Sequence, residues 1–351
     1  MSNKYLLNVS VGPVQEFIAE ARKVRDLWVG SYLLSMLTYK ALKPFMDNSD
    51  YDIIYPAYKT SPVYKRLNSQ PVSDPDLLIA SFPNHFLVSV PGTSLVTLIK
   101  SSHDECQQYW EEISESTKKL IQKDLDSIFN AIKGSSTPDK WDSLWENQIK
   151  DHWIYMWVAL PVNEEDLKTN YQDCIKKIQR LLEERKMTRT FAQWHGSPAI
   201  KCTQYARRES MGPDDLAKNK IFWERSQDRF DATIRKGDRL CAVCLIKRFI
   251  KPEHFKINGL KDIRFQSTMD VAVKPYKELV NNLDDNIKKD FLDRVNNIRK
   301  IITPYKKEVA NIDEIEGDFF YRDEMDEKRH LKEYAVKAAD KSKLKEYLNV
   351  F

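Results

Sequence analysis

Long hydrophobic runs are missing from this chain of 351 residues. No apolar stretch approaches the roughly 18 residues that a membrane-spanning helix needs, so the sequence predicts no membrane span. The first five residues, MSNKY, also lack the basic and apolar regions of a secretory signal peptide. We therefore expect a cytoplasmic protein with no membrane partner.

Cysteine is scarce, and the common nucleotide and hydrolase motifs are missing. Five cysteines, an odd number in a long chain, do not suggest the disulfide framework of a secreted domain. Reduced thiols or a metal site are expected instead. The sequence contains no G-x-x-x-x-G-K-[ST] loop, no G-x-G-x-x-G turn and no G-x-S-x-G elbow.

A large excess of one charge is missing too, because the formal net charge is only +4. The basic residues are nevertheless concentrated, since residues 185–251 hold 16 Lys or Arg against seven Asp or Glu. Aromatic residues are interleaved with them, a mixture that suits RNA because cations meet phosphates and rings stack on unpaired bases. A solvated charged face is the equally acceptable alternative. The candidate RNA-proximal cations are Arg207, Arg208, Arg235, Lys236, Arg239, Lys247 and Arg248.

Short apolar runs bounded by Pro, Gly and Asn predict four strands. Apolar residues at three- and four-residue steps predict a helix after the first run, over 14–42, and another after the third, over 106–132. The order strand, helix, strand, strand, helix, strand is that of a ferredoxin-like unit, which polymerase and cyclase palms also use. The predicted strands are Leu6–Val11, Asp52–Pro56, His85–Val90 and Trp153–Pro161.

The sequence therefore predicts an α+β protein with three parts. Residues 1–187 are expected to form a ferredoxin-like, palm- or cyclase-like domain with helical insertions. Residues 188–255, which are basic and carry three of the five cysteines, are expected to form a zinc-knuckle module. Residues 256–351 are dominated by charged helical patterns and are expected to form a helical domain.

The strongest local motif is the pair Cys241 and Cys244, because two thiolates at this spacing can bind one tetrahedral zinc ion. A second knuckle is expected around Cys202, but Tyr205 stands where its second thiol would be. His195 or another side chain would complete a site with three cysteines. Two alternatives remain. The loop could be supported by packing without a metal, or Cys241 and Cys244 could form a redox pair, although the βαβ context of a redox motif is missing.

Residues after the turn at Gly12 are candidates for a nucleotide-facing surface, because a helix N-terminus offers free N–H groups to a phosphate. Phosphoryl-transfer palms also need neighbouring carboxylates to hold Mg²⁺. The Asp pairs at 214–215 and 284–285 do not follow a glycine turn between strands, so we assign no catalytic residue. From the residues alone, the charges in this segment are ordinary exposed positions on an amphipathic helix.

The segment from Val11 to Ser35 reads VGPVQEFIAEARKVRDLWVGSYLLS. It closely resembles the opening of the first palm in the large, polymerase-like subunit of type III-B (Cmr) CRISPR effector complexes. Three further segments resemble that family in the same order: Phe82–Pro91, the cysteine module Lys201–Arg248, and Ser267–Thr268 leading into a helical region.

The resemblance implies a subunit that works with other Cmr subunits, a CRISPR RNA and a target RNA. In the family, target binding switches on conversion of ATP to a cyclic oligoadenylate-type messenger, with Mg²⁺ held by a second palm that bears Gly-Gly-Asp-Asp. We expect that palm and the HD nuclease domain to lie outside this chain, which leaves its own enzymatic activity uncertain. The implied contacts of half an ATP pocket are Gly12, Gln15, Arg25 and Ser31.

A stand-alone zinc-containing RNA-binding module without enzymatic activity is the competing interpretation, since residues 185–251 alone would permit it. Co-purification with a ribonucleoprotein would separate the two.

Overall fold

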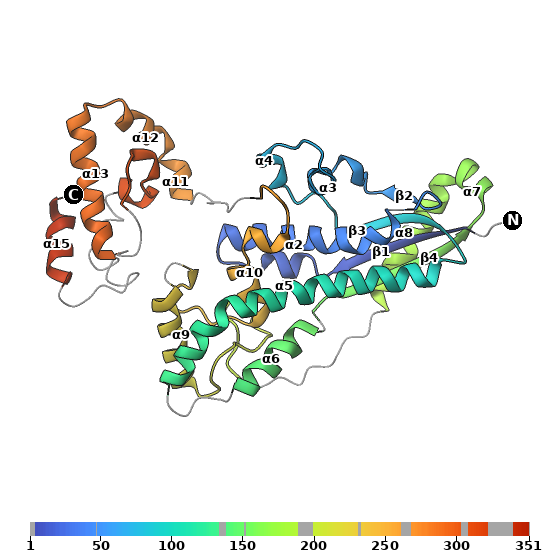
Figure 1. Ribbon diagram of the computed structural model, residues 1–351, viewed down its shortest axis with the longest axis horizontal. Helices are drawn as coiled ribbons and strands as arrows, with labels where there is room; N and C mark the ends of the chain where they lie inside the picture. The colour runs from blue at the N-terminus through green and yellow to red at the C-terminus, as the bar shows by residue number, and fades with distance from the viewer. Residues whose placement is uncertain are drawn as a thin grey trace. The chain divides into compact units, whose positions relative to one another are not determined.

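The computed structural model (Figure 1) describes residues 4–46, 48–132, 138–150, 152–188, 199–230, 233–260, 268–302, 308–321 and 340–350. Contacts within the chain divide it into two units, residues 1–263 and 264–351. This is a mixed α and β structure with one small sheet in the first unit. The finer division predicted at residues 187 and 255 stays a prediction.

The sheet contains the four predicted strands, each within two residues of its expected bounds. Its strand order is β2-β3-β1-β4, and every neighbouring pair is antiparallel. Side chains alternate between the two faces of a strand, and on β1 Leu7, Val9 and Val11 enter the main core while Leu6 enters a smaller one. The strands are β1 (Lys4–Gly12), β2 (Asp52–Tyr55), β3 (His85–Pro91) and β4 (Ile154–Val162).

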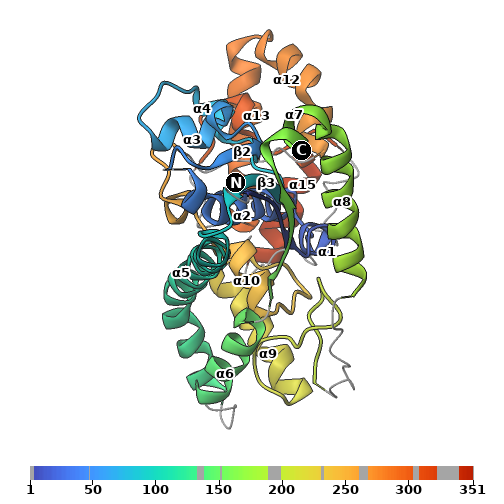
Figure 2. The same ribbon diagram turned by 90° about the vertical axis from the view of Figure 1, so that its right-hand side faces the viewer.

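Helices cover both faces of this sheet. Residues of α2 (Val24–Leu42) and α5 (Leu95–Ala131) share the main core with β1, and Trp110 is its largest fully buried side chain. On the other face, Ile178 of α8 (Tyr171–Met187) packs with Leu6. Figure 2 shows α8 on the side of the sheet opposite α2 and α5. The remaining helices of this unit that lie before residue 188 are α1 (Gln15–Ala19), η1 (Lys43–Phe45), η2 (Tyr58–Thr60), α3 (Pro62–Leu67), α4 (Asp74–Leu77), α6 (Pro138–Lys150) and α7 (Glu164–Thr169).

The prediction of a single helix over 14–42 is wrong, because the helix is interrupted between the end of α1 and the start of α2. A continuous helix would use the carbonyls of Phe17 and Glu20 as acceptors for the N–H groups four residues later. Here the ammonium of Lys247 donates to both carbonyls instead. A buried cation from a distant segment thus takes the place of the helix's own hydrogen bonds.

The basic segment packs into the first unit. Its helices α9 (Leu216–Phe230) and α10 (Ala242–Phe249) are followed by the short helix η4 (Pro252–Phe255). Leu240, Leu245 and Ile246 are fully buried in the same core as Trp110, beside the sheet helices. The cysteine-bearing segment is therefore held by the hydrophobic effect against the sheet and its helices.

The described residues of the second unit are helical. Its core is formed by apolar residues that include Val295 and Ile298 of α13 (Asp285–Ile302) and Leu344 of α15 (Lys341–Val350). Its other helices are α11 (Thr268–Ala272), α12 (Lys274–Asn281), η5 (Ile312–Glu314) and η6 (Gly317–Phe320). Among the helices of the described residues, none is long and apolar enough to cross a membrane.

Candidate metal centre

Two knuckles bring three cysteines together. Cys241 is the N-cap of α10 and Cys244 lies in its first turn, where the partial positive charge of a helix N-terminus favours thiolates. Cys202 lies in a short hairpin closed by a bridge between Lys201 and Glu209. Two backbone hydrogen bonds, Thr203 N to Arg239 O at 2.7 Å and Met211 N to Leu240 O at 2.8 Å, attach this hairpin to the chain before α10.

The three thiols have the spacing of a tetrahedral metal site. All three sulfur atoms lie within 4.8 Å of one another, and those of Cys202 and Cys244 are 3.7 Å apart. Tetrahedral zinc with Zn–S bonds of about 2.3 Å places its sulfurs about 3.8 Å apart. All three cysteines are buried. The cluster therefore fits a metal such as zinc, as the knuckle motif predicted.

The protonation of the cluster also suits metal binding. Hydrogen bonds from the thiols of Cys241 and Cys244 lower the pKa of Cys202. Hydrogen bonding to Cys202 and Cys241 raises the pKa of Cys244 well above its ordinary value. One thiolate is thus stabilised by two thiols, and a metal ion that bound here would displace their remaining protons.

A buried ion pair lies against the sulfurs. Arg208 donates two hydrogen bonds to the carboxylate of Glu20, at 2.8 and 3.1 Å, and its Nη1 is 3.7 Å from Cys241 Sγ. Glu20 Oε2 is 4.0 Å from Cys244 Sγ. Burial raises the pKa of Glu20, although the adjacent guanidinium of Arg208 acts in the opposite direction.

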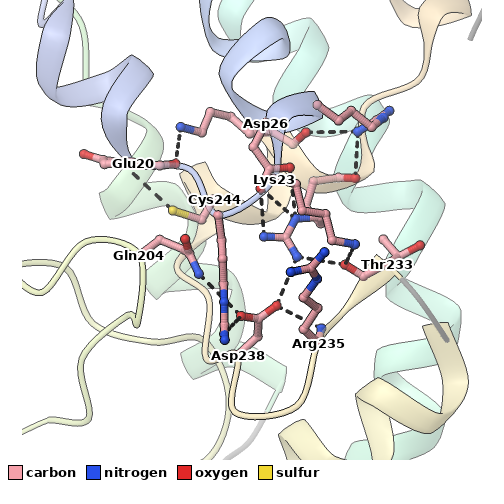
Figure 3. Close-up of polar contacts among 12 residues, drawn as sticks. Glu20, Lys23, Asp26, Gln204, Thr233, Arg235, Asp238 and Cys244 are labelled. Atoms are coloured by element: carbon pink, nitrogen blue, oxygen red, sulfur yellow. Dashed lines mark hydrogen bonds and ion pairs between the residues drawn. The ribbon is translucent and has the colours of Figure 1, made fainter. Parts of the chain in front are cut away.

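A second ionic network joins the start of α2 to α10 (Figure 3). The guanidinium of Arg248 contacts Asp26 at 2.8 Å and Asp238 at 3.0 Å, and these three side chains are at most 3% exposed. The more exposed Arg22 pairs with Asp238 at 3.0 Å, and Lys23 donates to the carbonyl of Thr233. The charges that follow α1 are therefore directed into the protein.

The predicted nucleotide contacts lie at the end of β1 and in the helices after it. Gly12 is the last residue of β1 and precedes a cis peptide bond to Pro13. Gln15 is exposed at the start of α1, and Ser31 is half-buried in α2. Arg25 donates hydrogen bonds to the carbonyls of Lys247, Arg248 and Ile250 at the end of α10. Its guanidinium is therefore engaged within the protein.

The predicted RNA-proximal cations differ in exposure. Arg207, Arg235 and Lys236 are exposed, and Arg208 and Arg239 are half-buried. Lys247 and Arg248 are 1% and 3% exposed. Their assignment to an RNA-facing surface is corrected, because both charges face protein groups. His195 lies outside the described residues.

The sequence did not point to the acidic partners of these cations. Glu20, Asp26 and Asp238 are all nearly fully buried and each accepts hydrogen bonds from an arginine. His152 was also missed, and burial lowers its pKa to about 3. One sequence signal was available for Asp26. It lies on the apolar face of a predicted helix, and a charged residue at such a position indicates a buried partner of opposite charge.

Comparison with known proteins identifies relatives of this chain. Residues 6–125 match the family model described as CRISPR-associated protein Cmr2, N-terminal. The CRISPR system Cmr subunit Cmr2 of Pyrococcus furiosus is 26% identical over 376 aligned residues, which cover 98% of this chain and 41% of that protein. This chain thus spans about two fifths of the length of that relative. The resemblance expected from Val11 to Ser35 is confirmed.

Solved structures show the same fold. A chain of the apo-state type III-B Cmr-beta cryo-EM structure matches with a TM-score of 0.58 at 17% identity, over 87% of this chain and 39% of the other. A chain of the type III-B Cmr-beta structure bound to cognate target RNA matches with a TM-score of 0.54 at 17% identity, over 83% of this chain and 39% of the other.

Proposed function

We propose that this chain, which is similar to Cmr2, forms part of the large subunit of an RNA-guided type III-B CRISPR effector complex. Its partners would be other Cmr subunits, a CRISPR RNA and a target RNA. One observation carries the proposal: the match to Cmr2 covers 98% of the chain, so both units take part in it. A related chain also belongs to a complex bound to cognate target RNA.

We propose that the first unit is a ferredoxin-like palm. In support, its elements follow the order β1, α2, β2, β3, α5, β4, and its sheet has the antiparallel strand order β2-β3-β1-β4. That order results when two strand-helix-strand units interleave, as in the split βαβ arrangement. Helices α2 and α5 pack together on one face, which is also expected of such a unit.

We further propose that Gly12, Gln15 and Ser31 contribute to half of an ATP pocket. They lie near the end of β1 and in the two helices that follow it. Arg25 would act indirectly, because its hydrogen bonds to α10 fix the start of α2 against the cysteine segment. Conversion of ATP to a cyclic oligoadenylate, with Mg²⁺, would belong to the complete subunit.

We propose that zinc has a structural role here, because Cys202, Cys241 and Cys244 join a hairpin to the start of a helix. A bound Zn²⁺ would cross-link these two segments and add its binding free energy to folding. The RNA-proximal surface would then be presented by the exposed members of the predicted set of cations, Arg207, Arg235 and Lys236.

The RNA proposal is tested with the triple variant R207Q/R235Q/K236Q. Its matched control is K176Q/K177Q/R180Q, which removes three exposed cations from α8. If each of the first three cations contacts a phosphate, the slope of log affinity against log salt should fall in magnitude by about 2 for single-stranded RNA. The measurement is RNA binding by the assembled complex at several salt concentrations.

The control should leave the slope unchanged, and equal slopes for both triple variants would refute the RNA assignment. Co-purification of the wild-type chain with a repeat-tagged guide RNA and other subunits is the expected result for a complex subunit. Recovery of the chain only as a free RNA-binding monomer would favour the stand-alone module instead.

A further inference from the structure

The three-cysteine cluster has no fourth thiol, because Tyr205 occupies the place where the second knuckle would supply one. Its hydroxyl donates to Glu16 at 2.7 Å, and its ring lies 4.1 Å from the guanidinium carbon of Arg208. Structural zinc sites are almost always four-coordinate. If the proposed zinc is bound, another donor from this chain is needed.

We propose that Glu20 is the fourth ligand and that the site is Cys202, Cys241, Cys244 and Glu20. The proposal rests on the zinc role proposed above. Glu20 Oε2 is 4.0 Å from Cys244 Sγ. In a tetrahedral site with ordinary Zn–S and Zn–O bonds, a sulfur and an oxygen ligand lie about 3.6 Å apart. The Glu20 carboxylate is not among the ligand atoms that all lie within 4.8 Å of one another, so on metal binding it would have to move toward the other two sulfurs.

The surroundings of Glu20 are those of a positioned ligand. Arg208 holds both carboxylate oxygens, and each oxygen keeps a further lone pair that a metal can use. Metal-binding carboxylates are commonly hydrogen-bonded in this way, which fixes their orientation. The backbone of Glu20 is held as well, because Lys247 of α10 donates to its carbonyl. The same helix α10 begins at Cys241, so ligand and cysteines share one support.

The charges around the cluster are compatible with a carboxylate ligand. Three thiolates and one carboxylate around Zn²⁺ leave two net negative charges, whereas a neutral fourth ligand leaves one. Two cations lie beside the cluster: Arg208, whose side chain is 15% exposed, and Lys247, which is 1% exposed. Both interact electrostatically with Cys241 and Glu20. These two cations offset the two net negative charges of a site with Glu20 as ligand, so a buried site of this composition is electrically balanced.

His152 is the strongest competing donor among the described residues. It is buried, and its Nε2 has no hydrogen-bond partner in the described part of the chain. However, its Nδ1 lies 3.4 Å from Arg208, and its ring packs against Phe17, Trp110 and Trp153. Arg208 is thus the polar neighbour of both Glu20 and His152, but only the carboxylate balances its charge.

X-ray absorption at the zinc edge on the purified chain of 351 residues tests the ligand set directly. Three sulfurs and one oxygen are expected, without the outer-shell scattering of an imidazole. Imidazole scattering would identify His152 or His195 as the ligand and overturn the proposal. Absence of zinc from the wild-type chain would overturn it together with the zinc role, while leaving co-purification with the complex as a separate test.

Variants give a second measurement, made by competition with a chelator. E20Q is expected to lower zinc affinity at least about tenfold, since loss of even an outer partner of a ligand has that effect. Adding Y205C to E20Q should restore affinity and give four sulfurs in the absorption spectrum. E16Q is the matched control, because Glu16 lies in α1, the short helix that ends at the cap residue Glu20, but is exposed. Equal zinc affinity of wild type and E20Q would overturn the proposal.

Discussion

Replacing Arg248 by Met should destabilise the first unit more than any surface change. The guanidinium contacts Asp26 at 2.8 Å, Asp238 at 3.0 Å and the carbonyl of Thr233 at 2.8 Å, and all three charged side chains are nearly fully buried. Methionine is similar in length and leaves the packing largely intact. What is lost is the positive charge between two buried carboxylates.

The magnitude follows from the two carboxylates that remain. Breaking a buried ion pair by removing one partner costs about 3–5 kcal/mol, because the other charge is left uncompensated. Asp238 keeps Arg22, whose side chain is 46% exposed and can compensate only in part. For a unit of this size, a loss of 3–5 kcal/mol lowers the midpoint of thermal unfolding by roughly 6 to 20 °C.

Tryptophan fluorescence during urea unfolding is the assay, because all eight tryptophans lie between Trp28 and Trp223. The signal therefore reports the first unit alone. Arg225→Met, at an exposed position of α9, is the control and should change stability by less than about 0.5 kcal/mol. A loss below about 1 kcal/mol for R248M would refute the reasoning. The triple variant D26N/D238N/R248M should recover most of the loss, because the buried carboxylates lose their charge together with Arg248 and the half-exposed Arg22 can be solvated.

Two further predictions concern the aromatic core beside the cysteines. The pKa of His152 is lowered by burial to about 3, so between pH 6.5 and 3 the unfolded chain binds a proton that the folded chain does not. The free energy of unfolding should therefore fall as the pH falls through that window. The fall should be less steep in H152F. By NMR, the imidazole signals of His152 should show no titration above pH 5. Trp110 is fully buried, and its indole N–H donates to the carbonyl of Ile149 at 3.0 Å. Its replacement by Ala should lower the free energy of unfolding by about 3–5 kcal/mol, measured by urea unfolding followed by circular dichroism. A Trp110 variant within about 1 kcal/mol of wild type, or a His152 signal that titrates near pH 6, would contradict these two predictions.

The sheet could be predicted from the sequence because strand signals are local. Apolar runs bounded by Pro, Gly and Asn mark β1 and β3, and the structure moves their bounds by at most two residues. The start of α5 was placed eleven residues too late, since its first turns are mixed in polarity and Leu95 follows a Pro-Gly turn. Helix boundaries depend on weaker local signals, which tertiary contacts readily override.

The candidate site was only half predictable. Cysteine spacing identified Cys241 and Cys244, and the need of zinc for further ligands added Cys202 as part of a second knuckle. Glu20 and Asp26 could not be assigned to partners, because the residues that pair with them lie about 190 and 220 positions away. Sequence periodicity reports which side of a helix is buried but not which distant charge meets it.

Acidic residues at the end of α1 and in the first turn of α2 also reduce the positive charge that the basic segment can present. That segment carries an excess of positive charge, but Arg208 and Arg248 are neutralised by Glu20 and Asp26. Arg207 pairs with Glu16 at 3.2 Å on the surface, where such a pair contributes little and can exchange for a phosphate. Formal charge therefore overstates the cationic surface of this segment. The proposed RNA contacts should therefore depend on the exposed cations of this segment, whereas its buried cations, Lys247 and Arg248, hold the cysteine knuckles against the sheet unit.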